Sequence, residues 1–466
     1  MITTRKLYRK IHRKICCTGL LAVLITSPVV ADEETGITAF VNVNVVRPET
    51  NSVDKSRTVI VTGTKISRIG AANKVSVPAD ALVIEGKGRY LVPGLVEMHA
   101  HVPGTKQGRE YVEEVLFLWV ANGITTIRNM SGEASHLELR EEIASRQILG
   151  PRMYTAGPRF MGRRIKTQAE AGAIVDEQVA AGYDFLKVHM GLTRVAYDGV
   201  VATAAEHDIP VAGHVAPDIG LWHALEAGQA TIDHLDSYMQ ALTADDADVS
   251  GLDDGLLGSP YTPFVDESKI AAVARATKDA GTWNVPTLTL AENFVGPYDE
   301  SRPLTGAEYM PPKIVRSWVG LATVYQKSIP DPEVAQRFLG YRKRLVKALH
   351  DEGAGLLLGS DAPQIFNVPG FSLHNELDLM VEAGLTRAEA LTTGTLNPAV
   401  FFDAEGTFGQ VKEGLDADLV LVAENPLREH ASLRNPLGVM LQGFWMTGEE
   451  LQTGLELIAT RYATGD

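Results

Sequence analysis

Cysteine is almost absent from this chain of 466 residues, which contains only Cys16 and Cys17. Both lie near the N-terminus, so the rest of the chain can form neither disulfide bonds nor thiolate metal sites. Beyond the N-terminal segment there is also no apolar run of about eighteen residues, which excludes an internal membrane-spanning helix. Charged residues make up 22% and hydrophobic residues 45% of the chain, the range of an ordered globular protein.

Basic residues are also fewer than acidic residues. The chain has 43 basic and 58 acidic residues, a net charge of −15. Six of the basic residues and no acidic residue lie before residue 32, so the chain without that segment carries −21. Such an acidic protein is a poor partner for nucleic acid or anionic membranes. Its glycine-rich stretches lack a phosphate-loop pattern, so nucleotide binding has no support either.

The N-terminal segment has the order of a secretory signal. Basic residues between Arg5 and Lys14 are followed by the apolar stretch 15–25, small residues up to Ala31 and the acidic start at Asp32. This order predicts a signal peptide at 1–31 and an exported protein, periplasmic or secreted, with no membrane attachment after cleavage. An uncleaved anchor is the alternative. A lipid anchor on Cys16 or Cys17 fits poorly, because no small-residue lipobox precedes them.

The pattern of predicted secondary structure changes twice along the rest of the chain. Residues 38–93 read as strands and turns, and strand-like segments return after about residue 402. Between them, short apolar strands alternate with amphipathic helices about eight times. This predicts an α/β fold, a (β/α)₈ TIM-type barrel at 94–400, with a small β-sandwich domain built from both chain ends, 32–93 and 401–466. Residues 242–261 are expected to form a loop and 297–331 a partly helical insertion.

His99 and His101 follow the first apolar strand of the barrel region. Residues two apart in a strand point to the same side, so both imidazoles are expected at the barrel mouth. The pair alone is weak evidence, because 12 histidines in a chain of this length give roughly 0.3 such pairs by chance.

Four further residues lie at or near the ends of later predicted strands: Lys187, His214, His234 and Asp361. A lone lysine in a buried strand is costly. It is either paired with an acid or carbamylated, since a neutral amine can capture carbon dioxide and become an anion that bridges two cations. Imidazoles and carboxylates suit Zn²⁺ and similar ions.

The ordered set of motifs resembles the amidohydrolase superfamily, and is most similar to its imidazolonepropionase-like and prolidase-like metallo-dipeptidase branch. The segments that carry the resemblance are 92–101, 123–126, 185–187, 213–214, 232–234, 359–361, 372–376, 391–398 and 414–420. Together they cover nearly the whole chain after the predicted signal.

The resemblance implies a site with two divalent metal ions, zinc in the first place. His99 and His101 would bind one ion, His214 and His234 the other, and carbamylated Lys187 would bridge both. Asp361 would bind the first ion and act as general base for a bridging hydroxide, while the second ion polarises the scissile carbonyl.

The implied reaction is hydrolysis of an amide bond in a small substrate, a dipeptide such as Xaa-Pro or an N-acyl amino acid. A cyclic-amide or lactone hydrolase is the alternative enzyme, and a non-catalytic metal-binding protein is the alternative from another class. A homo-oligomer is compatible with the sequence.

Candidate substrate-binding residues are Tyr238, His136 and His374, with packing as the alternative for Tyr238. His189 is expected either behind the metal site or in packing. Arg128 is expected either to bind an anion or to form an internal salt bridge, and Asp233 has no predicted role.

Overall fold

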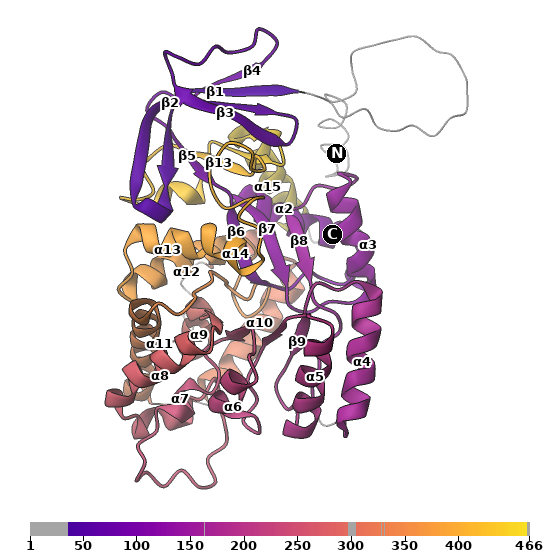
Figure 1. Cartoon of the computed structure of the whole chain (residues 1–466), viewed down its shortest axis with the longest axis vertical. Helices are drawn as coiled ribbons and strands as arrows, with labels where there is room; N and C mark the ends of the chain where they lie inside the picture. The colour runs from indigo at the N-terminus through magenta and orange to yellow at the C-terminus, as the bar shows by residue number, and fades with distance from the viewer. Residues whose placement is uncertain (1–35, 163, 297–303, 328, 330, 464–466) are drawn as a thin grey trace, which may run out of the picture.

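The computed structural model describes residues 36–162, 164–296, 304–327, 329 and 331–463 (Figure 1). The predicted signal peptide at 1–31 therefore lies outside the described residues, as does part of the predicted insertion, 297–303. Among the helices that are described, none combines the length and apolarity that crossing a membrane requires.

Strands from both ends of the chain form one sheet, at the top of Figure 1. Its order is β15-β14-β13-β5-β1-β2-β3, with β4 paired to β1. The strands are β1 (Ile37–Arg47), β2 (Ser52–Thr62), β3 (Lys65–Ala71), β4 (Leu82–Glu85), β5 (Tyr90–Pro93), β13 (Leu419–Val422), β14 (Gly438–Leu441) and β15 (Phe444–Thr447). β5 and β13 pair antiparallel, which joins the two ends of the chain. One apolar cluster, with Phe40, Val59, Leu419 and Met440 among its members, draws on both segments.

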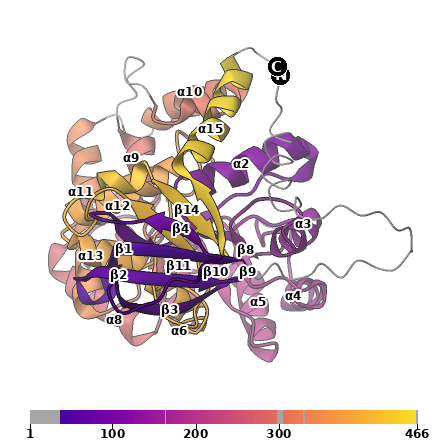
Figure 2. The ribbon, with the colours of Figure 1, turned by 90° about the horizontal axis from the view of Figure 1, so that it is seen from above.

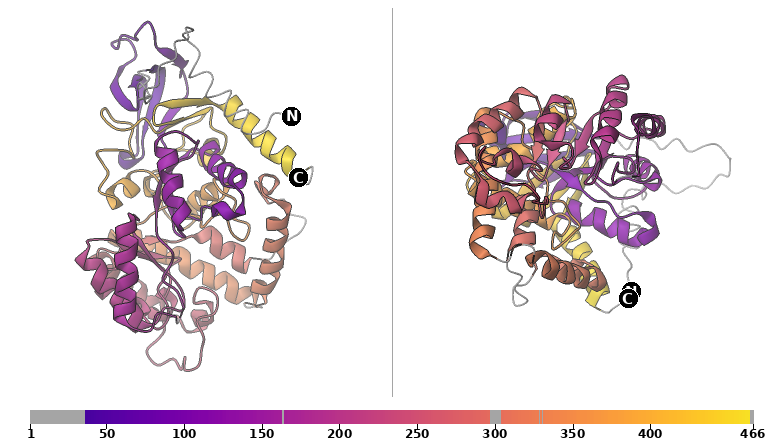
Figure 3. Two further views of the ribbon diagram at one scale, coloured as in Figure 1. Left: turned by 90° about the vertical axis from the view of Figure 1, so that its right-hand side faces the viewer. Right: turned by 90° about the horizontal axis from the view of Figure 1, so that it is seen from below.

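The middle of the chain forms two parallel sheets covered by helices (Figures 1 and 3). One has the order β6-β7-β8 and the other β12-β11-β10-β9. The strands are β6 (Leu95–Ala100), β7 (Ile124–Asn129), β8 (Arg152–Thr155), β9 (Leu186–Val188), β10 (Val211–Gly213), β11 (Thr231–Asp233) and β12 (Trp283–Val285). The predicted α/β class is thereby confirmed. Seen from above, the β1–β4 layer lies over these strands (Figure 2).

Helices follow most of the parallel strands, as a strand–helix alternation requires. They are α2 (Arg109–Ala121), α3 (Ala134–Ala144), α4 (Gln168–Ala181), α5 (Arg194–Glu206), α6 (Gly220–Glu226), α7 (Tyr238–Ala241), α8 (Ile270–Asp279), α9 (Leu288–Val295), α10 (Pro312–Gln326), α11 (Pro332–Glu352), α12 (Phe371–Glu382), α13 (Arg387–Thr393), α14 (Leu396–Phe401) and α15 (Gly448–Ala463). Their apolar faces and the strands share the largest buried cluster of the described residues.

The two parallel sheets are linked at both sides by isolated bridges. Between β8 and β9, Ala156 bridges Phe185 in parallel. On the other side, the segment 355–362 lies between β12 and β6, and its Leu356 bridges Asn284 of β12 while its Ala362 bridges Ala100 of β6. This part of the chain is thus an extended segment with single bridges, because its backbone alternates between partners on two sides.

Local sequence explains the helix ends. α4 is an example: the Thr167 hydroxyl accepts the Glu170 amide at its start, and Gly182 has a left-handed conformation at its end. The last segment differs from the strand texture expected after residue 402, because α15 is helical and packs against α2 (Figure 2). There the Arg461 guanidinium is 2.7 Å from the buried Glu114 carboxylate.

Candidate metal centre

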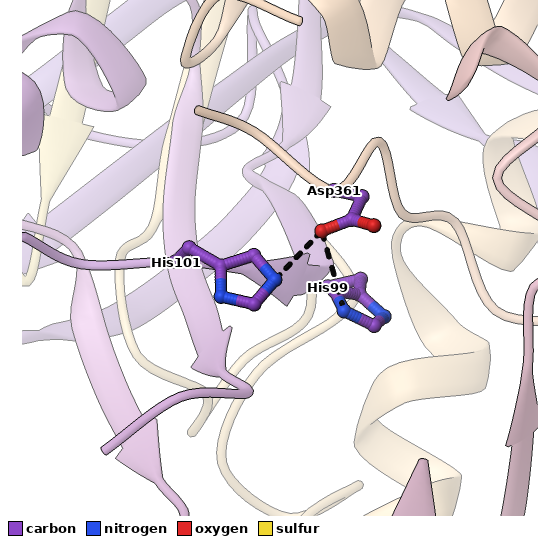
Figure 4. Close-up of side chains that lie close together, drawn as sticks. All are labelled: His99, His101 and Asp361. Carbon is purple, nitrogen blue, oxygen red and sulfur yellow. Dashed lines mark ion pairs between the residues drawn. The ribbon is translucent and has the colours of Figure 1, made fainter. Parts of the chain in front are cut away.

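His99 lies in β6, His101 follows its last residue, and both face Asp361 (Figure 4). Nε2 of His101 is 2.7 Å from Oδ1 of Asp361, and Nε2 of His99 is 3.4 Å from the same oxygen. One ligand atom from each of the three side chains lies within 4.8 Å of the other two. Two imidazoles and a carboxylate at this spacing form a donor set that Zn²⁺ accepts.

The backbone holds Asp361 beside β6. Its amide donates to the carbonyl oxygen of His99 over 2.9 Å, and the His101 amide donates to that of Ala362 over 2.8 Å. Asp361 has a φ of +65°, a left-handed conformation that is uncommon outside glycine and that clusters at functional sites.

His214 and His234 extend this group from the ends of β10 and β11. The His234 ring centroid is 4.6 Å from that of His99 and 4.5 Å from that of His214. Nδ1 of His214 is 2.7 Å from Oδ2 of Asp236, and Nδ1 of His234 is 2.8 Å from Oγ1 of Thr287. These partners occupy Nδ1 and leave Nε2 of both rings as a possible ligand, the usual arrangement around metal-binding histidines.

The amine of Lys187, in β9, is buried within the same group of side chains, with 1% of the residue exposed. Its Nζ has no hydrogen-bond partner among the described residues and lies 3.5 Å from Oδ2 of Asp233. Burial lowers the pKa of Lys187, although the charges of Asp233 and Asp361 act in the opposite direction. A lowered pKa favours the neutral, nucleophilic form of a lysine amine.

Asp233, for which the sequence predicts no role, forms ion pairs and a hydrogen bond with several buried side chains. Its Oδ1 lies 3.2 Å from the Arg128 guanidinium and 2.9 Å from the Thr231 hydroxyl, and its Oδ2 lies 3.0 Å from Nδ1 of His99. Burial raises the pKa of Asp233, but the charge of Arg128 together with the contacts to His99 and Lys187 outweighs this and holds that pKa well below its usual value. Of the two interpretations of Arg128, the structure favours the internal salt bridge.

Burial also keeps the imidazoles neutral at pH 7. It lowers the pKa of His99 to about 4 and that of His214 to about 3. The pKa of His234 is also well below its usual value, for the same reason. Burial raises the pKa of Asp361, but the neighbouring imidazoles of His99 and His101 outweigh it and keep that pKa low. Neutral imidazoles and an ionised carboxylate are the forms that bind a metal ion.

Glu97 is a buried acid of this region that sequence reasoning missed. Its carboxylate accepts the amides of His99 and Ser360 over 3.1 and 2.8 Å, and the Ser360 hydroxyl over 2.5 Å. It therefore ties β6 to the segment that carries Asp361. Burial raises its pKa to about 8. The available signal was an acid within an apolar strand, two residues before His99.

A cavity of about 320 Å³ lies beside His101, within the size range of small-molecule sites. Its lining includes Glu133, His136 and Ile314, the last from helix α10 of the predicted insertion. Both ring nitrogens of His136 already have partners: Nδ1 is 3.0 Å from the side-chain nitrogen Nδ2 of Asn129, and Nε2 is 3.3 Å from the Pro103 carbonyl oxygen. Contact between His136 and a substrate stays a prediction.

The two other residues predicted to contact substrate, Tyr238 and His374, do not line this cavity. The Tyr238 hydroxyl is buried 2.9 Å from Oγ1 of Thr277 in α8 and 2.8 Å from Oδ1 of Asn284 in β12, which supports the packing alternative. Nε2 of His374 is 3.1 Å from the carbonyl oxygen of Asn122, just before the amino end of β7. His374 therefore lies at the end of the sheet away from the candidate metal ligands, where it joins α12 to the residue that follows α2.

His189 follows β9, and its ring centroid is 4.4 Å from that of His214. It is half-buried, and its Nδ1 has no hydrogen-bond partner in the described part of the chain. Of its two predicted positions, the structure supports the one next to the metal ligands.

The sequence profile of the amidohydrolase family matches residues 90–446. The chain belongs to the amidohydrolase family. This membership confirms the predicted class, a hydrolase of amide bonds.

Solved structures have the same fold over nearly their whole length. A Xaa-Pro dipeptidase with bound methionine is 19% identical, with a TM-score of 0.65, over 88% of this chain and 100% of that one. Bottromycin amidohydrolase is 22% identical, with a TM-score of 0.70, over 91% of this chain and 90% of that one. A dihydroorotase from Anaeromyxobacter dehalogenans (strain 2CP-C) is 35% identical over 78 residues, 16% of this chain and only 17% of that protein.

Proposed function

We propose that this amidohydrolase uses two divalent metal ions, zinc in the first place, to cleave the amide bond of a dipeptide or an N-acyl amino acid. The observation that carries the proposal is the convergence of six side chains from five parts of the chain: the end of β6, which supplies two of them, β9, the ends of β10 and β11, and the segment 355–362. His99, His101 and Asp361 would hold one ion, and His214 and His234 the other.

The residues present fit two ions. The imidazoles of His99 and His214 are neutral and Asp361 is ionised at neutral pH, the forms in which these side chains bind a metal ion. The buried Nζ of Lys187 has no hydrogen bond among the described residues, and the nearby Asp233 already pairs with Arg128. Lys187 is thus a second basic side chain beside a carboxylate that already has an ion-pair partner. We take it as the carbamate that bridges the two ions.

The same proposal includes a closed (β/α)₈ barrel. The bridges between β8 and β9 and on both sides of the segment 355–362 support it, because in a closed barrel that segment would be the eighth strand, between β12 and β6. A closed ring would bring the carboxyl ends of all eight strands to one face, where barrel enzymes have their active sites.

Bound metal ions would lower the pKa of a water molecule toward neutrality and polarise the scissile carbonyl group. The protein's own residues supply proton transfer. Oδ1 of Asp361 faces His99 and His101, and Oδ2 lies 3.7 Å from Nε2 of His234. Oδ2 would accept the proton of the attacking water. It then donates that proton to the leaving nitrogen.

The cavity beside His101 favours a small substrate. Its volume suits a dipeptide-sized molecule, and its walls combine apolar groups such as Ile314 with the carboxylate of Glu133. One structural neighbour is a Xaa-Pro dipeptidase, which supports placing Xaa-Pro dipeptides first among the candidates.

The test is a screen of zinc-loaded protein on dipeptides including Xaa-Pro, N-acyl amino acids and lactones. We expect turnover of an amide, and a fall in kcat of about 10²- to 10⁴-fold in Asp361→Asn. Asp351→Asn is the matched control, because Asp351 is exposed and pairs with Lys347 on the outside of α11. Turnover of lactones alone would reject the peptidase assignment, and an active Asp361→Asn would reject the mechanism.

We also propose export. The basic and apolar order of residues 1–31 supports it. Expression of the full chain in a Gram-negative host should give a periplasmic protein whose N-terminal sequence begins at Asp32. Recovery of the uncleaved chain in the cytosol would contradict this proposal.

A further inference from the structure

Arg342 is a fully buried arginine of α11, with 0% of its surface exposed, and it reaches the end of β11. Its NH2 group donates to two backbone carbonyl oxygens, that of His234 over 2.5 Å and that of Pro286 over 3.1 Å. Its Nε and NH1 have no hydrogen-bond partner among the described residues. The hydrogen bonds seen there thus go to the two chain segments that follow β11 and β12.

Those two segments have unfavourable backbone conformations. His234 has a φ of +60° and Leu235 a φ of +50°, and Thr287, which follows Pro286, has a φ of +46°. Side-chain-bearing residues in the left-handed region cost free energy, and they persist only when the surroundings impose them. His234 and Thr287 also contact each other directly, Nδ1 to Oγ1, over 2.8 Å. The orientation of the His234 ring therefore depends on both strained segments.

Packing alone does not explain an arginine here. Burial lowers its pKa to about 10, so the guanidinium remains charged at neutral pH. A buried cation is costly, and an apolar side chain of similar volume would fill the same space without that cost. Asp236 and Glu376 lie near enough to offset part of the charge, and Asp236 also holds Nδ1 of His214.

We propose that Arg342 is a positioning residue that holds the left-handed turn at His234 and so aims Nε2 of His234 at the metal ion. Its guanidinium joins the carbonyl groups of His234 and Pro286 and neutralises the partial negative charge that these oxygens bring together. The inference rests on the proposed function, because it concerns the ion that His234 would bind.

The test uses Co²⁺ as probe on the full chain after removal of metal with a chelator. Binding is followed by the visible absorption of Co²⁺ and by metal content. His234→Ala first identifies which Co²⁺ depends on His234. We expect Arg342→Met to raise the dissociation constant of that same ion about tenfold or more, and to leave the other ion within about twofold. Arg342→Lys, which keeps the charge and one donor, should give a smaller effect.

Arg344→Met is the matched control. Arg344 lies two residues away on α11, is half exposed and pairs with Glu267, so its loss should leave both ions unchanged. If Arg342→Met does not fold, Arg342→Lys takes the same measurement. The inference is overturned if the folded Arg342 variants bind both ions like the wild type or weaken both ions equally. A wild type that binds only one Co²⁺ would instead reject the two-metal function. In that case, weaker binding of the single Co²⁺ in both Arg342→Met and His234→Ala would support the inference. Unchanged binding in Arg342→Met would overturn it.

Discussion

Removal of Arg128 should destabilise the metal-free protein strongly, because it leaves a carboxylate buried without its main cation. Arg128 and Asp233 are both 0% exposed, and the guanidinium lies 3.2 Å from Oδ1 of Asp233. It also donates to the Met98 carbonyl oxygen over 2.7 Å and to the Thr231 hydroxyl over 3.2 Å. The side chain therefore links β6, β7 and β11 immediately behind the metal ligands.

The magnitude follows from this burial. Breaking one partner of a buried ion pair costs about 3–5 kcal/mol, because the remaining charge stays out of water. We therefore expect Arg128→Met to lower the free energy of unfolding by about 3–5 kcal/mol. Arg194→Met is the control, since Arg194 is half exposed and pairs with Asp198 on the surface, where such pairs contribute about 0–1 kcal/mol.

The assay is urea unfolding of chelator-treated protein, followed by circular dichroism. The double variant Arg128→Met with Asp233→Asn separates the causes. If the uncompensated carboxylate is responsible, the double variant should be more stable than Arg128→Met alone. A loss in Arg128→Met no larger than in Arg194→Met, or a double variant whose losses simply add, would refute this reasoning.

Three further predictions concern the metal site and its surroundings. Lys187→Ala should lower the zinc content from about two ions per chain to about one, measured by atomic spectroscopy; an unchanged content would exclude Lys187 as the bridge. Tyr238→Phe should leave kcat/KM within about twofold and cost about 1 kcal/mol of stability, because its hydroxyl bonds to Thr277 and Asn284; a large loss of activity with unchanged stability would restore the predicted substrate contact. The metal-free protein should lose stability as pH falls from about 6.5 toward about 4, because the pKa of His99 is lowered to about 4 in the fold and the unfolded state binds the proton first. His99→Gln should flatten that pH profile, and an equally steep profile would contradict it.

The order of the motifs was enough to predict the family and the ligand candidates. His99 and His101 lie at the end of one short apolar strand, and Lys187, His214, His234 and Asp361 lie in or just after four other short apolar segments. Strand ends in a parallel α/β fold meet at one face. The alternation of strands and helices predicted the α/β class for the same reason. These signals are local, because each depends on a few neighbouring residues and their spacing.

Side-chain direction outside the strands was not predictable in this way. Tyr238 follows His234 by four residues, yet its hydroxyl turns toward α8, because the left-handed residues of the intervening turn change the direction of the chain. His374 follows the Asp361 segment in sequence but packs near the amino end of β7. In both cases the packing of a helix against its neighbours determined where the side chain points.

The sequence by itself determined which residues can bind metal, since ligand chemistry depends on residue type and strand periodicity on spacing. Only the tertiary structure determined which buried side chains lie behind these residues and hold them in position. Asp233 pairs with Arg128, which is 105 residues away in the sequence. Glu97 accepts hydrogen bonds from Ser360, which is 263 residues away. Arg342 reaches the His234 carbonyl group across 108 residues. Such buried polar and charged groups are stable only where distant segments meet, because each needs partners that its own neighbours in the chain cannot supply.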